Sequence, residues 1–172
     1  MLEVNAILGQ KDLAKINRFV NYKEKSITDY FPEENVFLNQ SLRTVDDVIE
    51  FLADYVKSVD DLPDNYTQLI YEREEIAPTA YGNKIAIPHP ISPQSSKTFL
   101  TVCTLTRPIE WAGKKVQFVC LLNVEKNSQE DLQEMYRILG RIVNDEKLIQ
   151  RLIQSGTYHE FIQTLLRMEE ND

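Results

Sequence analysis

The sequence has little of what metal proteins, secreted proteins and membrane proteins require. Its 172 residues include two histidines and two cysteines, which are too far apart for any zinc-finger spacing. No run of about 18 apolar residues is present, and the N-terminus lacks the basic start, the apolar stretch and the small-residue cleavage site of a signal peptide. We therefore expect a soluble cytoplasmic protein with no metal, no cofactor and no membrane contact.

The two cysteines, Cys103 and Cys120, lie inside apolar runs. Neither has a CxxC partner or a basic neighbour that would favour a reactive thiolate. Both are expected to be buried in strands, where a free cysteine behaves as a small apolar side chain.

Positive charge is also scarce. Lysine and arginine number 19 against 27 acidic residues, which gives a net charge of −8. No basic cluster stands out in the sequence as a stripe that could follow a phosphate backbone. Direct binding of nucleic acid by this chain is therefore not expected.

What the sequence does contain is enough apolar residues, 42% of the total, for one folded domain. Residues 10–22 predict a helix with its apolar side chains on one face. We interpret residues 1–30 as a helical lead-in or as a linker from a preceding domain, and residues 31–172 as the domain itself. If the first segment is a linker, the chain is a fragment of a longer protein.

Helix signals lie near both ends of this domain. One helix should begin at Thr44, which forms a capping-box pattern with Asp47, and a second should begin after Asp64 and end before Pro78. Three further helical patterns lie in the C-terminal part, and they start at Ser128, Asp145 and Thr157.

Strand signals lie between the two groups of helices. Residues 85–90 read as a short strand that proline stops, residues 98–106 are rich in strand-forming residues, and residues 115–124 are almost continuously apolar. Residues 107–115 predict a turn. Helices before and after a set of strands predict an α/β fold with a central sheet covered on both faces.

The segment with the most chemical information is residues 73–90, REEIAPTAYGNKIAIPHP. His89 stands between Pro88 and Pro90 at the end of an apolar strand, so its backbone is stiff and its ring is expected at a sheet edge or crevice. Neutral imidazole is a nucleophile near pH 7, and the phosphoramidate that it forms can pass the phosphoryl group on. Without further context a histidine in such a pattern is more often structural, and a phosphoryl acceptor at His89 is the alternative.

Phosphoryl transfer needs cations and hydrogen-bond donors around the phosphoryl oxygens. Arg73 can supply a planar pair of donors and Thr79 a hydroxyl, so these two are the candidate phosphate-binding residues. The other histidine, His159, follows the predicted helix cap at Thr157, and we expect it to have only a surface or capping role.

The order Arg-Glu-x-x-x-Pro-Thr, then Gly and Ile-Ala-Ile-Pro-His, resembles the type-2 (mannitol/fructose) enzyme IIA domain, EIIA, of the bacterial sugar phosphotransferase system, PTS. The resemblance covers about residues 38–168 and implies a mixed sheet of about five strands flanked by helices on both faces. It also implies that His89 accepts phosphate at Nε2 from the phosphocarrier HPr, with Arg73 and Thr79 as phosphate-binding partners. The phosphate then passes to a cysteine of enzyme IIB, EIIB.

Two positions depart from the transport members of that family. Asp131 stands where many of them have a second histidine beside the acceptor, and Asn83 stands where the mannitol transporter domain has an acidic residue. Both are candidates to orient His89 or to influence its phosphate. The alternative for Asp131 is helix capping together with Ser128.

These departures resemble the EIIA-like domains at the C-terminal end of transcription activators and antiterminators that carry PTS regulation domains. The leading hypothesis is a phosphohistidine domain that controls such a regulator, with HPr, EIIB and the other regulator domains as partners. The alternatives are a transport phosphocarrier, which is an enzyme component, and a docking module that no longer depends on phosphorylation. The sugar cannot be predicted, because an EIIA domain contacts proteins and phosphate.

Overall fold

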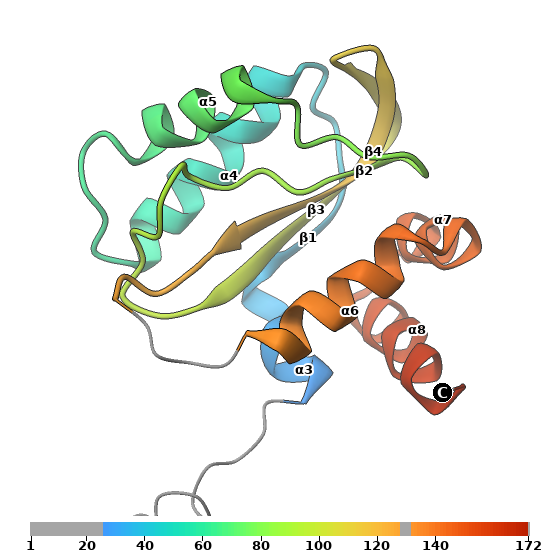
Figure 1. Cartoon of the computed structure of the whole chain (residues 1–172). Coiled ribbons are helices and arrows are strands. Elements are labelled where there is room, and N and C mark those ends of the chain that lie inside the picture. The colour runs from blue at the N-terminus through green and yellow to red at the C-terminus, as the bar shows by residue number, and fades with distance from the viewer. Residues whose placement is uncertain (1–25, 128–131, 172) are drawn as a thin grey trace, which may run out of the picture.

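The structure, a computed structural model, describes residues 26–127 and 132–171 and has a mixed sheet at its centre (Figure 1). In chain order the elements are α3 (Ile27–Tyr30), the 3-10 helix η1 (Glu33–Asn35), β1 (Val36–Gln40), α4 (Val45–Val59), α5 (Tyr66–Ile76), β2 (Ile85–Ala86), β3 (Phe99–Trp111), β4 (Lys114–Asn123), α6 (Gln133–Val143), α7 (Glu146–Gln154) and α8 (Tyr158–Glu170). The helix predicted over residues 10–22 lies outside the described residues, and so do Ser128 and Asp131. The predicted helix start at Ser128 is wrong, because α6 begins at Gln133.

The four strands of the sheet have the order β1-β3-β4-β2. β1 is parallel to β3 and β2 is parallel to β4, whereas β3 and β4 form an antiparallel hairpin. The hairpin turn consists of Ala112 and Gly113, whose φ angles of 50° and 84° are both positive, as a two-residue type I′ turn requires. The sheet is therefore mixed, as predicted.

The turn predicted over residues 107–115 is wrong in its extent. Residues 107–111 belong to β3, and only Ala112 and Gly113 form the turn. The pairing of β3 with β4 is irregular between Thr104 and Ile109 and then resumes. Pro108 has no N–H to donate to the sheet, which is why this irregular part of a strand resembles a turn in the sequence.

One strand, β1, was not predicted from the sequence, and the sheet has four strands among the described residues where the resemblance implies about five. Ser95 forms one isolated parallel bridge with Glu125, and its N–H donates to the Val124 carbonyl at 3.2 Å. One isolated bridge is too short to count as an additional strand.

The predicted helix starts at Thr44, Asp145 and Thr157 are confirmed. The Thr44 hydroxyl accepts the Asp47 N–H at 3.0 Å, and the Thr157 hydroxyl accepts the Glu160 N–H at 3.2 Å. Asp145 caps α7 in the same way, by accepting the Leu148 N–H. Such caps satisfy backbone donors that have no partner within the helix, so they define where each helix begins.

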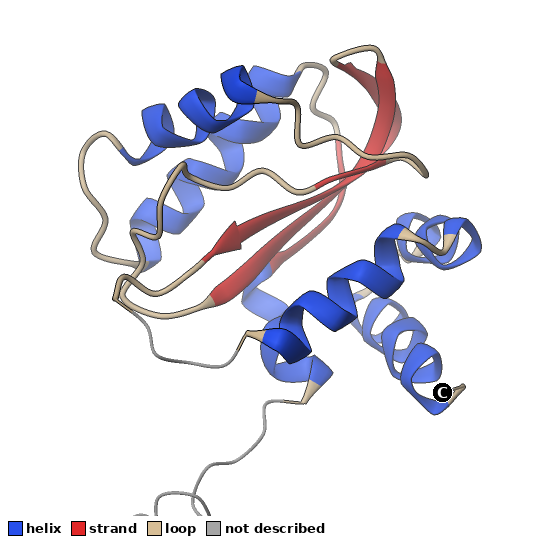
Figure 2. Ribbon diagram, viewed as in Figure 1, coloured by secondary structure: helices blue, strands red, loops and turns tan. Residues whose placement is uncertain are grey.

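Helices cover both faces of the sheet (Figure 2). Along β4, Phe118, Cys120 and Leu122 face the core that α3, α6, α7 and α8 complete, whereas Val119 and Leu121 face the core that α4 and α5 complete. This alternation explains why β4 is almost continuously apolar in sequence. No helix of the described part of the chain is long and apolar enough to cross a membrane.

Candidate functional site

The direction of the His89 side chain follows from the way in which side chains along β2 and the residues after it point to opposite faces of the sheet in turn. Ile85 and Ile87 face α6, and Ala86 between them faces the opposite core. His89 is two residues beyond Ile87 and lies on the α6 side, where its half-buried ring lines a cleft. The Pro88 carbonyl accepts the Leu122 N–H at 3.0 Å, so the segment that carries His89 is tied to β4.

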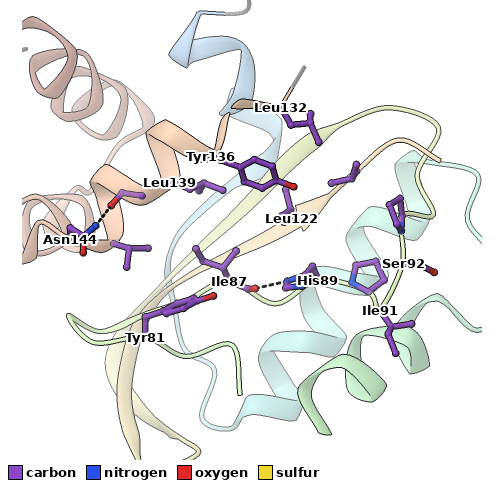
Figure 3. A pocket seen from close by; sticks show the side chains of 15 residues that line it. Tyr81, Ile87, His89, Ile91, Ser92, Leu122, Leu132, Tyr136, Leu139 and Asn144 are labelled. Carbon is purple, nitrogen blue, oxygen red and sulfur yellow. Dashed lines mark hydrogen bonds between the residues drawn. The ribbon is translucent and has the colours of Figure 1, made fainter. Parts of the chain in front are cut away.

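The two ring nitrogens of His89 have different surroundings. Nδ1 lies 3.0 Å from the carbonyl oxygen of Ile87 (Figure 3). Because a carbonyl oxygen can only accept a hydrogen bond, this contact requires the proton on Nδ1 and leaves the lone pair of a neutral ring on Nε2. Nε2 is therefore the nitrogen at which a neutral ring could act as a nucleophile.

The cleft that contains His89 has a volume of about 650 Å³. Figure 3 shows Tyr136 and Leu139 of α6 on one side, Tyr81 and Ile87 on the other, and Leu122 of β4 nearby. Most of its remaining lining is apolar as well, namely Pro90, Ile91, Pro93, Val124, Leu132 and Val143. A phosphorylated His89 would thus lie at the edge of an apolar surface.

Exposed apolar side chains gather at this cleft. The large apolar side chains that are exposed in the described residues are Val59, Ile76, Tyr81, Ile91 and Tyr136. Three of them, Tyr81, Ile91 and Tyr136, line the cleft. Exposed apolar groups that collect in one place are typical of a surface that a protein partner covers.

The structure places Arg73 and Thr79 outside the lining of the cleft. Nη1 of Arg73 donates to the Ala77 carbonyl at 2.7 Å, just beyond the end of α5. Thr79 is buried, its hydroxyl donates to Glu74, and its carbonyl accepts the Ile87 N–H at 3.0 Å. Thr79 is thus next to the strand that leads to His89, and no hydrogen bond within the described residues joins either side chain to His89.

Asn83 connects two segments that line the cleft. Its φ angle is 63°, a conformation that asparagine tolerates better than most residues, and its Nδ2 donates to the Val143 carbonyl at 3.0 Å. Tyr81, two residues before Asn83, and Val143, whose carbonyl accepts this hydrogen bond, both line the cleft. The side-chain amide of Asn83 is therefore bonded to the last residue of α6. Asp131 lies outside the described residues.

Comparison with known proteins agrees with this architecture. Residues 29–168 match the family described as "Phosphoenolpyruvate-dependent sugar phosphotransferase system, EIIA 2". This match spans most of the chain. The chain belongs to the EIIA type-2 family.

Two curated relatives of this EIIA-type domain differ in how much of their length it covers. It is 42% identical over 160 residues to the probable licABCH operon regulator of Bacillus subtilis, covering 93% of this chain and 25% of that protein. It is 24% identical over 140 residues to the mannitol-specific phosphotransferase enzyme IIA component of Staphylococcus aureus, covering 80% of this chain and 95% of that protein. The chain thus spans a quarter of the regulator and nearly all of the transport component.

The EIIA-type fold also has close structural neighbours. One is the complex of enzyme IIA for mannitol and phosphorylated enzyme IIB from Escherichia coli, with a TM-score of 0.68 and 22% identity, covering 80% of this chain and 97% of that one. At this identity the likeness shows the fold alone. It confirms a central mixed sheet flanked by helices.

Sequence reasoning passed over Glu74, the second residue of the Arg-Glu motif. Its carboxylate accepts hydrogen bonds from the backbone and hydroxyl of Thr79 and from the indole of Trp111. The sequence offered no sign of these contacts, because an acidic residue near the end of a helix is usually solvated. Trp111 itself is buried beside the β3–β4 turn.

His159 is exposed in the first turn of α8, with the cap Thr157 just before it. It lines a different depression from His89, together with Arg151, Ser155 and other residues of α7 and α8. Within the described ranges, no group of three or more His, Cys, Asp or Glu side chains could hold a metal ion.

Proposed function

We propose that this EIIA-type domain accepts a phosphoryl group at Nε2 of His89 from a phosphohistidine carrier protein of the HPr type. The observation that carries the proposal is the contact between Nδ1 and the Ile87 carbonyl, which leaves Nε2 with the lone pair. That lone pair attacks phosphorus, the bond between phosphorus and the donor nitrogen breaks, and the donor ring recovers its electron pair. The Nδ1 proton stays on His89, and the transfer needs no metal ligand from this chain.

We propose that Arg73 stabilises the phosphoryl oxygens during this transfer. Its guanidinium has five N–H donors, and the bond of Nη1 to the Ala77 carbonyl uses only one of them. The role of Thr79 as a phosphate ligand stays a prediction. Its hydroxyl donates to Glu74, so it could serve a phosphoryl oxygen only after that bond breaks.

The carrier protein is proposed to dock over the cleft around His89. The exposed side chains of Tyr81, Ile91 and Tyr136 give the apolar contact area that a protein partner would bury. An EIIB protein or domain is proposed to use the same face, because it must reach the same phosphorylated nitrogen. In support, a complex with phosphorylated enzyme IIB is known for the mannitol enzyme IIA of Escherichia coli, which has the same fold.

We further propose that the domain acts within a longer sugar-responsive transcription regulator, in the cytoplasm, where its phosphorylation reports on sugar transport. The similarity to the licABCH operon regulator, at 42% identity, supports this role over the transport role. The transport phosphocarrier is the second candidate, supported by the 24% identity to a mannitol-specific component that the chain covers almost completely. A docking module independent of phosphorylation has less support, because no hydrogen bond within the described residues occupies Nε2 of His89, which lines the cleft.

Phosphate incorporation tests the proposal directly. The chain is mixed with phosphoenolpyruvate, enzyme I and HPr, and its mass is followed with time. We expect one phosphoryl group in the wild type and none in His89→Ala. Incorporation that persists in His89→Ala would contradict the assignment of the acceptor.

A second measurement separates the regulator from the transport component. The full reading frame that contains this chain is sequenced, and the expected result is a nucleic-acid-binding domain and PTS regulation domains upstream of Met1. A frame that encodes only the EIIA-type domain would favour the transport phosphocarrier instead.

A further inference from the structure

Glu74, near the end of α5, receives hydrogen bonds from two segments, one five residues away and the other 37 residues away. The Thr79 N–H lies 3.3 and 3.2 Å from its two carboxylate oxygens, and the Thr79 hydroxyl donates to Oε1. The indole Nε1 of Trp111, 37 residues further along the chain, donates to Oε2 at 3.1 Å. One carboxylate therefore connects α5, the segment before β2 and the β3–β4 hairpin.

The two residues that donate to Glu74 are almost fully buried, whereas Glu74 itself is half-buried. Thr79 and Trp111 are each 1% exposed. A buried N–H or O–H needs an acceptor, and a carboxylate has only acceptor sites, on both of its oxygens. The fit between three buried donors and one acceptor group explains why an acidic side chain turns inward here.

From Glu74 a continuous series of hydrogen bonds leads to the ring of His89. The Thr79 N–H donates to Glu74, and the Thr79 carbonyl accepts the Ile87 N–H at 3.0 Å. The Ile87 carbonyl in turn accepts from Nδ1 of His89 at 3.0 Å. The Lys114 ammonium adds a second tie to this segment by donating to the Ala80 carbonyl at 3.3 Å.

We propose that Glu74 is a positioning residue for His89. By holding Thr79 in place, Glu74 also holds the backbone of Ile87 in place. The Ile87 carbonyl then orients the His89 ring, with the proton on Nδ1 and the lone pair on Nε2. The expected effect of Glu74 on the rate of phosphoryl transfer rests on the proposed function. The orientation and protonation of the ring can be measured without any transfer.

The test variant is Glu74→Gln, which keeps the size of the side chain. The amide has one acceptor oxygen and one NH2 group, so at least one of the buried donors loses its acceptor and the Thr79 segment shifts. The matched control is Glu75→Gln, which makes the same change of charge at the next residue of α5, an exposed position. Trp111→Phe in the Glu74→Gln background removes one of the competing donors and keeps an aromatic ring.

We expect Glu74→Gln to lower the rate of phosphorylation of His89 roughly 10- to 100-fold, as a small misplacement of a reacting group does. The double variant with Trp111→Phe should recover part of this loss, and Glu75→Gln should react at the wild-type rate. In the unphosphorylated protein, ¹⁵N NMR of the imidazole should show protonated Nδ1 in the wild type and in Glu75→Gln. In Glu74→Gln it should show a mixture of the two neutral tautomers.

Equal rates and equal imidazole spectra for Glu74→Gln and Glu75→Gln would overturn the inference and leave the proposed function intact. A slower Glu74→Gln variant with an unchanged His89 spectrum would also overturn it, because the loss would then not act through the ring. Failure of the wild type to accept phosphate would instead refute the proposed function, while the NMR comparison would still test the role of Glu74.

Discussion

Nδ1 of His89 lies 3.0 Å from the carbonyl oxygen of Ile87, two residues earlier in the same segment. The contact fixes the rotation of the ring as well as its tautomer, because the donor must point back along the strand. Nε2 is consequently the nitrogen that is available for reaction in the cleft. Phosphoryl transfer and docking of a partner are expected to depend on this arrangement and on the apolar surface around it.

Replacing Arg73 with lysine should slow phosphoryl transfer even though the charge is kept. An ammonium group cannot reproduce the planar pair of donors that binds two phosphoryl oxygens. Losing one such charged hydrogen bond is expected to cost about 2–3 kcal/mol, which is roughly tens to hundreds of fold in rate. The control is Arg107→Lys, at an exposed position of β3 that does not line the cleft. Equal transfer rates for both variants and the wild type would place Arg73 outside the site.

Introducing a charge at the rim of the cleft should weaken docking of the carrier protein. Ile91 and Val59 are similarly exposed, at 46% and 48%, but only Ile91 lines the cleft. In Ile91→Asp the KM for phosphorylated HPr should rise about tenfold or more, since a docked partner would bury the new carboxylate. The maximal rate should change little. In Val59→Asp both constants should stay at the wild-type values, and an equal effect of the two substitutions would argue against this docking face.

Asp131 can be tested through the lifetime of the phosphohistidine, although the residue lies outside the described part of the chain. The next residue, Leu132, lines the cleft with His89. If the Asp131 carboxylate faces the phosphoryl group, repulsion should shorten its lifetime, so Asp131→Asn should lengthen it. Asp131→His should lengthen it further, because an imidazole can donate to a phosphoryl oxygen. Equal lifetimes for the three proteins would leave helix capping as the role of Asp131.

The thiols of Cys103 and Cys120 should be inert in the folded protein. Burial raises the pKa of each to about 12, and both side chains are completely buried. At about pH 8, roughly one thiol in ten thousand would then be ionised, and reagents would have no direct access to it. A thiol-specific reagent should therefore modify both residues only after denaturation. Immediate modification of either thiol in native buffer would contradict the burial.

The parts of the fold that depend on local chemistry could be predicted from the sequence. The caps at Thr44 and Thr157 involve residues only three positions apart, so capping patterns located α4 and α8 correctly. β1 was missed because it depends on distant pairing with β3, as in the bond from the Asn39 N–H to the Thr104 hydroxyl 65 residues away. Short strands without strong alternation have no comparable local pattern.

The display of the His89 ring at a cleft was predictable to a similar degree, whereas Arg73 and Thr79 do not line that cleft. The prolines on both sides of His89 indicated a rigid, displayed ring, and the ring does line an open cleft. Its tautomer could not be predicted, because the group that determines it is the backbone carbonyl of Ile87. The role of Glu74 could not be predicted either, since its contact with Trp111 forms only when the hairpin folds against α5.

The most direct test of this account is to identify the phosphorylated atom. The chain, labelled with ¹⁵N at histidine, is phosphorylated with phosphoenolpyruvate, enzyme I and HPr, and the bond between nitrogen and phosphorus is located by ¹⁵N and ³¹P NMR. We expect one phosphohistidine, at His89, with phosphorus on Nε2 and the proton on Nδ1, and the same signal in His159→Ala. Phosphorus on Nδ1 of His89, or on His159, would contradict the account.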